Sequence, residues 1–397
     1  EGEAALWPLE HGLAFLNHGS FGACPTEVLR HQSALRAEME AEPVRFLSRE
    51  LDGRLDVART ALAAFVGAAP EDLAFVTNAT SGVNAVLRSL PLGHDDELLT
   101  TDHAYKACWN TLDFVAERAR ARVVVAPIPF PLRSADDVVG AVLSRVTART
   151  RLALLDHVTS PTALILPIER LIAELGRRGI DVLVDGAHAP GMLPLDLGAL
   201  GAAYYSGNCH KWLCAPKGSA FLWVRRDRRS EVRPLTISHG AGVTRADRSR
   251  FHLEFDWTGT SDPTAWLTVP KAIEYVGSLV PGGWPEVMAT NRALALEARA
   301  LVCAAAGTAP PCPEGMVGSI ASIVLPDGPS SDIAWRRPDP IQQRLFDSWR
   351  TEVPVMSWPA APHRLIRISA QLYNERGQYE RLAEALGKEL AAERAPR

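Results

Sequence analysis

The architecture of this chain follows from one segment, Asp181-Val182-Leu183-Val184-Asp185-Gly186-Ala187-His188. Its apolar, β-branched run is typical of a buried parallel strand. Twenty-six residues after Asp185 comes Lys211, in Asn208-Cys209-His210-Lys211-Trp212. Because a carboxylate at the carboxyl end of a strand in an open sheet borders the ligand crevice, the two segments predict one site that contains Asp185 and Lys211.

A lysine amine and a buried carboxylate are the groups that pyridoxal 5'-phosphate (PLP) chemistry requires. The amine forms a Schiff base with the cofactor aldehyde, and the carboxylate keeps the pyridine nitrogen protonated. The neighbours of Lys211 are poorly hydrated, which lowers the pKa of a lysine toward its neutral form. Alone, Asp185 is compatible with a turn cap and Lys211 with a solvated loop lysine. Together they favour a PLP enzyme.

Short apolar runs alternate with amphipathic stretches from about residue 54 to about residue 225. This alternation predicts an α/β fold with a mainly parallel sheet and helices between the strands. The seven candidate strands are 73–77, 97–101, 122–126, 152–157, 181–185, 202–206 and 220–224, and the candidate helices include 81–90, 105–119, 135–146 and 168–178. Beyond about residue 265 longer helices follow. We predict a packed N-terminal segment (1–24), a large domain (25–265) and a small C-terminal domain (266–397).

The composition is that of an ordinary globular protein, with 47% hydrophobic and 22% charged residues. A net charge of -4 gives no reason to expect nucleic acid or an anionic membrane as partner. The six cysteines form no CxxC pair, so we expect free thiols and no metal site. No signal peptide and no apolar run of membrane-spanning length is found, and we expect a cytoplasmic location.

A third segment, Thr77-Asn78-Ala79-Thr80-Ser81-Gly82-Val83-Asn84, follows a strand and opens a helix. Unpaired N–H groups at a helix start, together with the hydroxyls of Thr80 and Ser81, suit a phosphate group. The same residues are typical of an ordinary N-cap. Because the preceding strand belongs to the sheet that ends in Asp185, we favour the phosphate of the cofactor.

These segments and several others resemble the class V aminotransferase family of fold-type I PLP enzymes, in particular its isopenicillin N epimerase-like branch. The resemblance covers most of the chain and lies in 15–22, 42–46, 101–105, 160–162, 185–191, 210–218 and 367–369. It implies a fold-type I architecture, with a seven-stranded, mainly parallel sheet, helices on both faces, and a smaller C-terminal α+β domain. It also implies a homodimer with shared active sites and a small-molecule amino acid as substrate.

The resemblance implies roles for individual residues. Lys211 forms the internal aldimine, Asp185 pairs with the pyridine nitrogen, and His188 lies near the phenolic oxygen. His103 stacks on the ring as a third catalytic residue, with Tyr105 as the competing candidate. The implied contacts to the phosphate and its surroundings are Ala79, Thr80, Asn208, His210 and, from the neighbouring subunit, Thr260.

For the substrate, the resemblance points to Arg367, since a guanidinium binds a carboxylate through two parallel hydrogen bonds. Arg45 is a second candidate for the same or a distal carboxylate. The other implied substrate contacts are Asn17, His18 and Tyr105.

The reaction begins with an external aldimine and removal of the Cα proton by Lys211, which gives a carbanion. We favour β-elimination by a C–S lyase acting on an S-cysteinyl conjugate in natural-product biosynthesis. An epimerase is the close alternative, and it needs a second acid, for which His18, Tyr105 and Tyr373 are candidates. Decarboxylation, transamination and a catalytically inactive binding module are further alternatives. Desulfuration is disfavoured because 352–359 holds no cysteine.

Overall fold

The computed structural model describes residues 3–328 and 338–394. Residues 1–2, 329–337 and 395–397 belong to the predicted terminal segment and C-terminal domain and lie outside the described residues. None of the helices within the described ranges is long and apolar enough to cross a membrane.

The seven predicted strands form one sheet, which confirms the fold class. Its strand order is β2-β8-β7-β6-β5-β3-β4. All neighbouring pairs are parallel except the two that β8 makes, with β2 and with β7. The strands are β2 (Leu73–Val76), β3 (Glu97–Thr101), β4 (Arg122–Ala126), β5 (Thr150–Asp156), β6 (Asp181–Asp185), β7 (Tyr204–Asn208) and β8 (Ala220–Val224).

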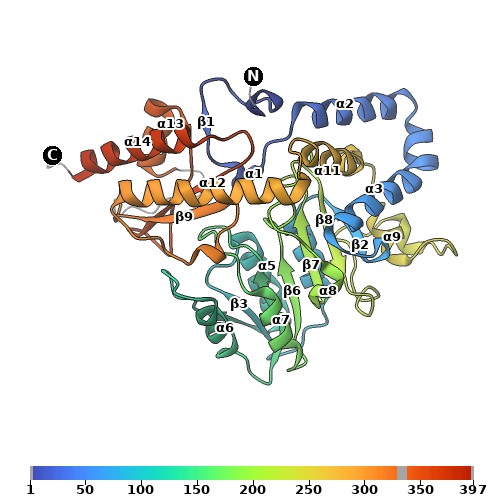
Figure 1. The fold of residues 1–397 in the computed structure, drawn as a ribbon. Coiled ribbons are helices and arrows are strands. Elements are labelled where there is room, and N and C mark those ends of the chain that lie inside the picture. Colours follow the sequence, from blue (N-terminus) through green and yellow to red (C-terminus); the bar gives the residue numbers. More distant parts are fainter. Residues whose placement is uncertain (1–2, 329–337, 395–397) are drawn as a thin grey trace.

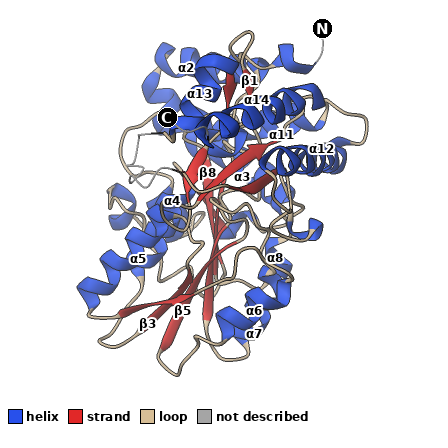
Figure 2. Ribbon diagram, turned by 90° about the vertical axis from the view of Figure 1, so that its left-hand side faces the viewer, coloured by secondary structure: helices blue, strands red, loops and turns tan. Residues whose placement is uncertain are grey.

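Helices cover both faces of this sheet, which is why most residues of its central strands are buried. In Figure 2, α4 and α5 lie on one side of the sheet and α6, α7 and α8 on the other. Helix α7 packs on the sheet through one apolar face, because its residues at three- and four-residue spacing are buried, namely Ile168, Leu171, Ile172 and Leu175. The bounds are α4 (Ala79–Ser89), α5 (Lys106–Ala119), α6 (Ala135–Leu143), α7 (Ile168–Gly176) and α8 (Leu197–Leu200).

Residues before and after the sheet add further helices. Before it come α1 (His18–Phe21), α2 (Thr26–Ala41), the π-helix Arg45–Glu50 and α3 (Leu51–Val66). After it come α9 (Arg250–Phe255), α10 (Thr264–Leu267) and α11 (Val269–Gly277). Contacts of α10 and α11 with α2 and α3 bring these two parts of the chain together.

A second, three-stranded antiparallel sheet lies in the C-terminal part, in the order β11-β12-β9. The long helix α12 packs against β9 and α14, and Figure 1 shows these elements in orange and red together. The bounds are β9 (Ile320–Leu325), β11 (Val355–Ser357), β12 (Arg364–Ser369), α12 (Gly283–Ala306), α13 (Pro340–Trp349) and α14 (Arg376–Arg394).

The N-terminal segment joins this C-terminal part through one short parallel pairing. Strand β1 (Ala14–Phe15) pairs with β10 (Thr351–Glu352), and Ser369 donates its backbone N–H to Leu16 over 2.9 Å. The pairing places α1 between the strand that carries Arg367 and the loop after β7. Residues from both ends of the chain therefore meet at one edge of the large sheet.

Candidate active site

A cavity of about 520 Å³ opens at the edge where β5, β6 and β7 end. Seven predicted site residues line it, namely Thr80, Tyr105, Asp185, His188, Asn208, His210 and Lys211. They meet there because the carboxyl ends of neighbouring parallel strands share one edge of a sheet.

Lys211 extends its amine into this cavity. Its Nζ lies 3.1 Å from Nε2 of His188. Burial, followed by the positive charge of Arg367, lowers the pKa of Lys211 to about 7. At neutral pH a large fraction of this amine is uncharged, so it is a competent nucleophile and base.

The hydrogen bonds of His188 favour the neutral form of the amine beside it. The indole Nε1 of Trp212 can only donate, and it donates to Nδ1 of His188 over 3.3 Å. The proton of the neutral imidazole is then on Nε2, where it faces the lone pair of Lys211. Burial also lowers the pKa of His188 well below its ordinary value, so the imidazole is uncharged.

Asp185 is buried at the end of β6, with an exposed fraction of 3%. Its carboxyl group accepts hydrogen bonds from the Cys108 thiol (3.1 Å) and from the backbone N–H of Ala187 (3.0 Å). Burial raises the pKa of Asp185, and these two donors together with the charge of Lys211 oppose the rise. The two donors thus partly offset the loss of hydration of this carboxyl group, and a positive charge beside it would stabilise its ionised form.

The start of α4 forms the opposite end of the cavity. Asn78 caps the helix by accepting the N–H of Ser81 over 2.8 Å. Asn208 accepts the N–H of Ala79 over 2.8 Å, so the backbone donor of Ala79, a predicted cofactor contact, is already occupied. Thr80 lines the cavity and remains the predicted anion contact of this helix start.

His210 borders the same end. Its Nδ1 donates to the carbonyl oxygen of Ser219 over 2.9 Å, which leaves Nε2 as the second ring nitrogen. Burial lowers the pKa of His210 to about 4, so the ring is neutral without an anion beside it. A bound phosphate would favour the protonated ring and raise that pKa.

Arg367 is a buried cation on β12, with an exposed fraction of 4%. Its Nη1 donates to the carbonyl oxygen of Ser160 (2.6 Å), and its Nη2 donates to the hydroxyl of Ser20 (2.9 Å). Its Nε has no partner, and no acidic side chain pairs with it among the described residues. Arg367 itself is not among the residues that line the cavity, whereas Ser20 and Ser160, which hold it, are. Burial lowers the pKa of Arg367 to about 10, which still leaves it charged at neutral pH.

His103 lies outside the lining of the cavity. Its ring nitrogens meet the hydroxyl of Thr162 (2.7 Å) and the carbonyl oxygen of Ile128 (3.1 Å), and the ring packs edge-on against Trp358. Tyr105 does line the cavity and has an exposed fraction of 43%. Of the two candidates for stacking on the cofactor ring, the structure therefore favours Tyr105.

His18 and Asn17 lie behind the site and do not line the cavity. Nδ1 of His18 meets the hydroxyl of Tyr373 (2.9 Å), and Nε2 meets the carbonyl oxygen of Lys211 (3.0 Å). Asn17 accepts a hydrogen bond from the hydroxyl of Ser20 over 2.6 Å. Both residues support the cavity wall from behind. Neither is among the described residues that line the cavity, so the direct substrate contacts that we expected of them are not seen.

Arg45 and Thr260 also lie away from this cavity. Nε of Arg45 is 3.4 Å from Oε1 of Glu50, and the arginine side chain is about half exposed. Thr260 is exposed on the loop before α10. Within one subunit, neither residue contributes to the described lining.

The structure adds residues that the sequence analysis did not assign. Ser20 and Ser160 line the cavity and hold Arg367, and both lie in segments that carry the family resemblance. Asp156 lines the cavity at the end of β5, in register with Asp185. The available signal was an acid next to the last residue of the predicted strand 152–157.

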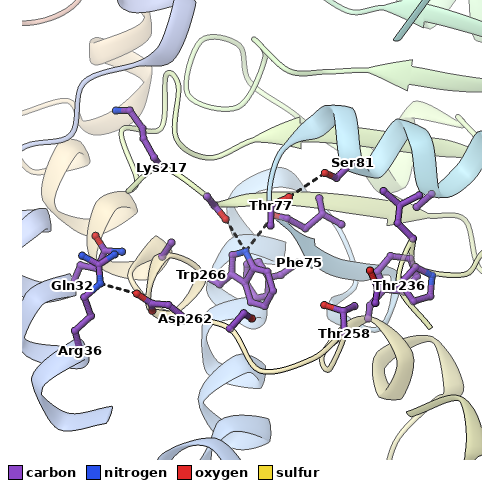
Figure 3. A pocket seen from close by; sticks show the side chains of 18 residues that line it. Gln32, Arg36, Phe75, Thr77, Ser81, Lys217, Thr236, Thr258, Asp262 and Trp266 are labelled. Atoms are coloured by element: carbon purple, nitrogen blue, oxygen red, sulfur yellow. Dashed lines mark hydrogen bonds and ion pairs between the residues drawn. The ribbon is translucent and has the colours of Figure 1, made fainter. Parts of the chain in front are cut away.

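A second cavity, of about 490 Å³, touches the first at Ser81, which lines both. Figure 3 shows Thr77 and Ser81, at the start of α4, facing the same space as Thr258 and Asp262. The indole of Trp266 closes its floor by donating to the carbonyl oxygens of Val76 (3.2 Å) and Gly218 (3.0 Å). The loop that carries Thr260 therefore lies beside the phosphate end of the first cavity.

These features fit PLP. The cavity combines a neutral lysine amine, a buried carboxyl group held by two donors, and a capped helix start at its other end. An unpaired guanidinium close to this cavity is a binding group for a carboxylate. Lysine, aspartate and helix start are the three groups that the aldehyde, the pyridine nitrogen and the phosphate of PLP require.

Comparison with known proteins agrees with this geometry. Residues 23–334 match the aminotransferase class-V family. The chain is 40% identical to isopenicillin N epimerase of Amycolatopsis lactamdurans, over 96% of each chain. It is 31% identical to putative L-cysteine desulfhydrase 1 of Oryza sativa subsp. japonica, over 96% of this chain and 84% of that protein.

Solved structures show the same fold. A mutant of C-DES with glycine covalently linked to its PLP cofactor superimposes with a TM-score of 0.80 at 21% identity, covering 98% of this chain and 99% of that one. From the fold, the geometry and the sequence match together, we conclude that the chain belongs to the class V aminotransferase family of PLP-dependent enzymes.

Proposed function

We propose that the protein cleaves the C–S bond of an S-substituted cysteine by β-elimination. The observation that carries the proposal is the Lys211 amine, whose pKa is lowered to about 7, in a cavity whose wall residues Ser20 and Ser160 hold the cation of Arg367. β-Elimination needs only one base at Cα together with a leaving group at Cβ. The similarity to a putative L-cysteine desulfhydrase supports the same reaction class.

Arg367 binds the substrate carboxylate in this proposal. Ser160 and Ser20 hold the guanidinium in place, and no acid within the described ranges neutralises its charge, which is left for the ligand. A buried cation without a counter-ion is costly, and a carboxylate bound in parallel to its donors removes that cost. The substrate thereby receives a fixed orientation next to Lys211.

Lys211 moves the proton. Its neutral Nζ accepts the proton from the substrate Cα. His188, whose Nε2 lies 3.1 Å from this Nζ, holds the free amine in place until the substrate is bound. The chemistry that PLP supplies when bound is electron withdrawal from Cα. Asp185 supports it by holding the pyridine nitrogen protonated, with Cys108 and Ala187 fixing its carboxyl group.

Epimerisation of an amino acid is the second candidate, and a specific observation favours it. It requires a second acid near Cα, and Tyr105, one of the three candidates, lines the cavity, whereas His18 and Tyr373 do not. Burial raises the pKa of Tyr105, so its hydroxyl carries a proton at neutral pH. The identity of 40% to isopenicillin N epimerase supports this alternative.

We further propose that the protein works as a homodimer in which Thr260 reaches the phosphate of the neighbouring subunit. Thr260 is exposed, and its loop lies beside the phosphate end of its own subunit. Near a two-fold axis, the same loop of the second copy meets the same region, as isologous contacts require.

One experiment distinguishes the two reactions. The holoenzyme is incubated in deuterated water with S-substituted cysteines and with ordinary L-amino acids, and products are followed by mass spectrometry and chiral separation. Pyruvate with a released thiol is the expected result. Deuterium at Cα with inversion and an intact side chain would instead establish the epimerase.

The pKa of Lys211 predicts how the apoenzyme captures PLP as the pH changes. Only the neutral amine attacks the aldehyde, and the pKa is about 7. Below this value the rate constant for capture should fall about tenfold per pH unit, and above it the rate should level off. Stopped-flow absorbance between pH 5.5 and about 9 measures this profile, and an ordinary lysine would still be rising at the upper limit.

A further inference from the structure

Two carboxyl groups stand side by side in the cavity. Asp156 ends β5 and Asp185 ends β6, and the two residues are direct partners in the parallel ladder. Each has an exposed fraction of only 3%, and both line the cavity. Two neighbouring buried carboxylates repel each other and lose hydration, so they do not both ionise at neutral pH.

Their surroundings differ, and the difference favours placing the charge on Asp185. Asp185 accepts hydrogen bonds from the thiol of Cys108 and the N–H of Ala187. Asp156 meets backbone N–H groups of Tyr105 and of its own residue, but no side-chain donor among the described residues. Burial, and then the charge of Asp185, raise the pKa of Asp156 well above its ordinary value.

The titratable groups that face Asp156 come from every element around it. They are Asp185 on β6, Lys211 after β7 and Cys108 on α5. Cys108, whose pKa burial raises well above its ordinary value, is a neutral thiol. Above the pKa of Lys211, which is about 7, its amine is mostly neutral as well. The carboxyl pair then holds a single negative charge, on Asp185, and that charge matches one pyridinium.

The strand order places Asp156 on a definite side of the cavity. The phosphate end is formed by Thr80 at the start of α4 and by Asn208 on β7, and β6 and then β5 follow in the sheet. In PLP the phosphate arm and the phenolic oxygen lie on opposite sides of the axis through the pyridine nitrogen and the aldehyde carbon. With Asp185 at that nitrogen, Asp156 faces the side remote from the phosphate.

We propose that Asp156 is a second cofactor-contacting acid, which acts in its protonated form beside ionised Asp185 and donates a hydrogen bond into the side of the cavity remote from the phosphate. The proposal rests on the assignment of this cavity to PLP. In this arrangement the two aspartates have different roles. Asp185 supplies charge, and Asp156 supplies a neutral donor.

Asparagine is the decisive probe, because it keeps the shape of aspartate and a donor but never ionises. The variants Asp156→Asn, Asp185→Asn and Asp156→Leu are compared through the dissociation constant of PLP and the pH titration of the visible absorption band of the holoenzyme. Asp156→Asn should bind PLP within about threefold of the wild type. Asp185→Asn and Asp156→Leu should bind at least about tenfold more weakly, since each loses an interaction with a buried group.

Either of two results would overturn the proposal. If Asp156→Asn weakens PLP binding as strongly as Asp185→Asn does, Asp156 acts in its ionised form. If Asp156→Leu binds PLP like the wild type, Asp156 makes no contact with the cofactor. Thermal unfolding checks that the leucine variant folds. If it does not fold, the pH titration of the visible band decides. A midpoint for Asp156→Asn within about 0.3 pH units of the wild type supports a neutral Asp156, and a shift of about one unit contradicts it. Unaltered PLP binding by Asp185→Asn would instead refute the cofactor site itself.

Discussion

Lys211→Ala should lower turnover by about three to four orders of magnitude, because it removes the general base of the reaction. The same change removes the amine that captures the cofactor aldehyde. PLP should still bind through its non-covalent contacts, but the visible band of the lysine-linked cofactor should be absent. Steady-state kinetics and absorbance spectra of the purified variant measure the two losses independently.

A matched control is Lys271→Ala. Lys271 lies on α11, where its Nζ is 3.5 Å from Oε2 of Glu274, and it does not line the active-site cavity. This variant should keep both the band and the turnover. Activity of Lys211→Ala above about a tenth of the wild-type value would exclude Lys211 as the base, since a positioned base contributes at least about a hundredfold.

Much of the fold could be predicted because its signals are local. Strands β3, β4, β6 and β8 have the bounds read from their apolar runs, and β5 differs by at most two residues at each end. The cofactor residues at strand ends followed from the same reading. Asp185 and Lys211 line one cavity because each comes where a strand of the parallel sheet ends or shortly after it.

The partners of buried side chains could not be predicted in this way. No linear pattern shows that both ring nitrogens of His18 and of His103 are occupied by other groups, which is what removes these residues from the cavity lining. The significance of Asp156 likewise depends on strand register, which pairs it with Asp185. Such facts arise from tertiary contacts between residues far apart in the chain.

Arg367→Gln should raise the KM for a carboxylated substrate by about ten- to a hundredfold, the equivalent of about 1.5 to 3 kcal/mol for hydrogen bonds to a charged group. The expectation follows from the lack of an acidic partner, because the guanidinium has its hydroxyl and carbonyl supports but no counter-ion among the described residues. The amide of glutamine is still a hydrogen-bond donor but carries no charge, so the loss isolates the charge and the paired geometry of the guanidinium.

The same strand offers the matched control. Arg364 is as buried as Arg367, with exposed fractions of 2% and 4%, but it is paired with Asp339 (3.2 Å) and with Glu393 (2.6 Å). Arg364→Gln leaves the buried Asp339 without its cation, while Glu393 keeps Arg344. It should cost about 3 to 5 kcal/mol of stability with little effect on KM.

For Arg367→Gln the expected pattern is the reverse, because removing a buried charge that has no counter-ion relieves a desolvation cost. Its midpoint of thermal unfolding should stay at or above the wild-type value while KM rises. Thermal denaturation of the apoenzymes and steady-state kinetics of the holoenzymes test both variants. A loss of stability in Arg367→Gln with an unchanged KM would show that Arg367 is a structural cation. A retained unfolding midpoint together with a raised KM would show that the charge of Arg367 serves to bind the substrate carboxylate.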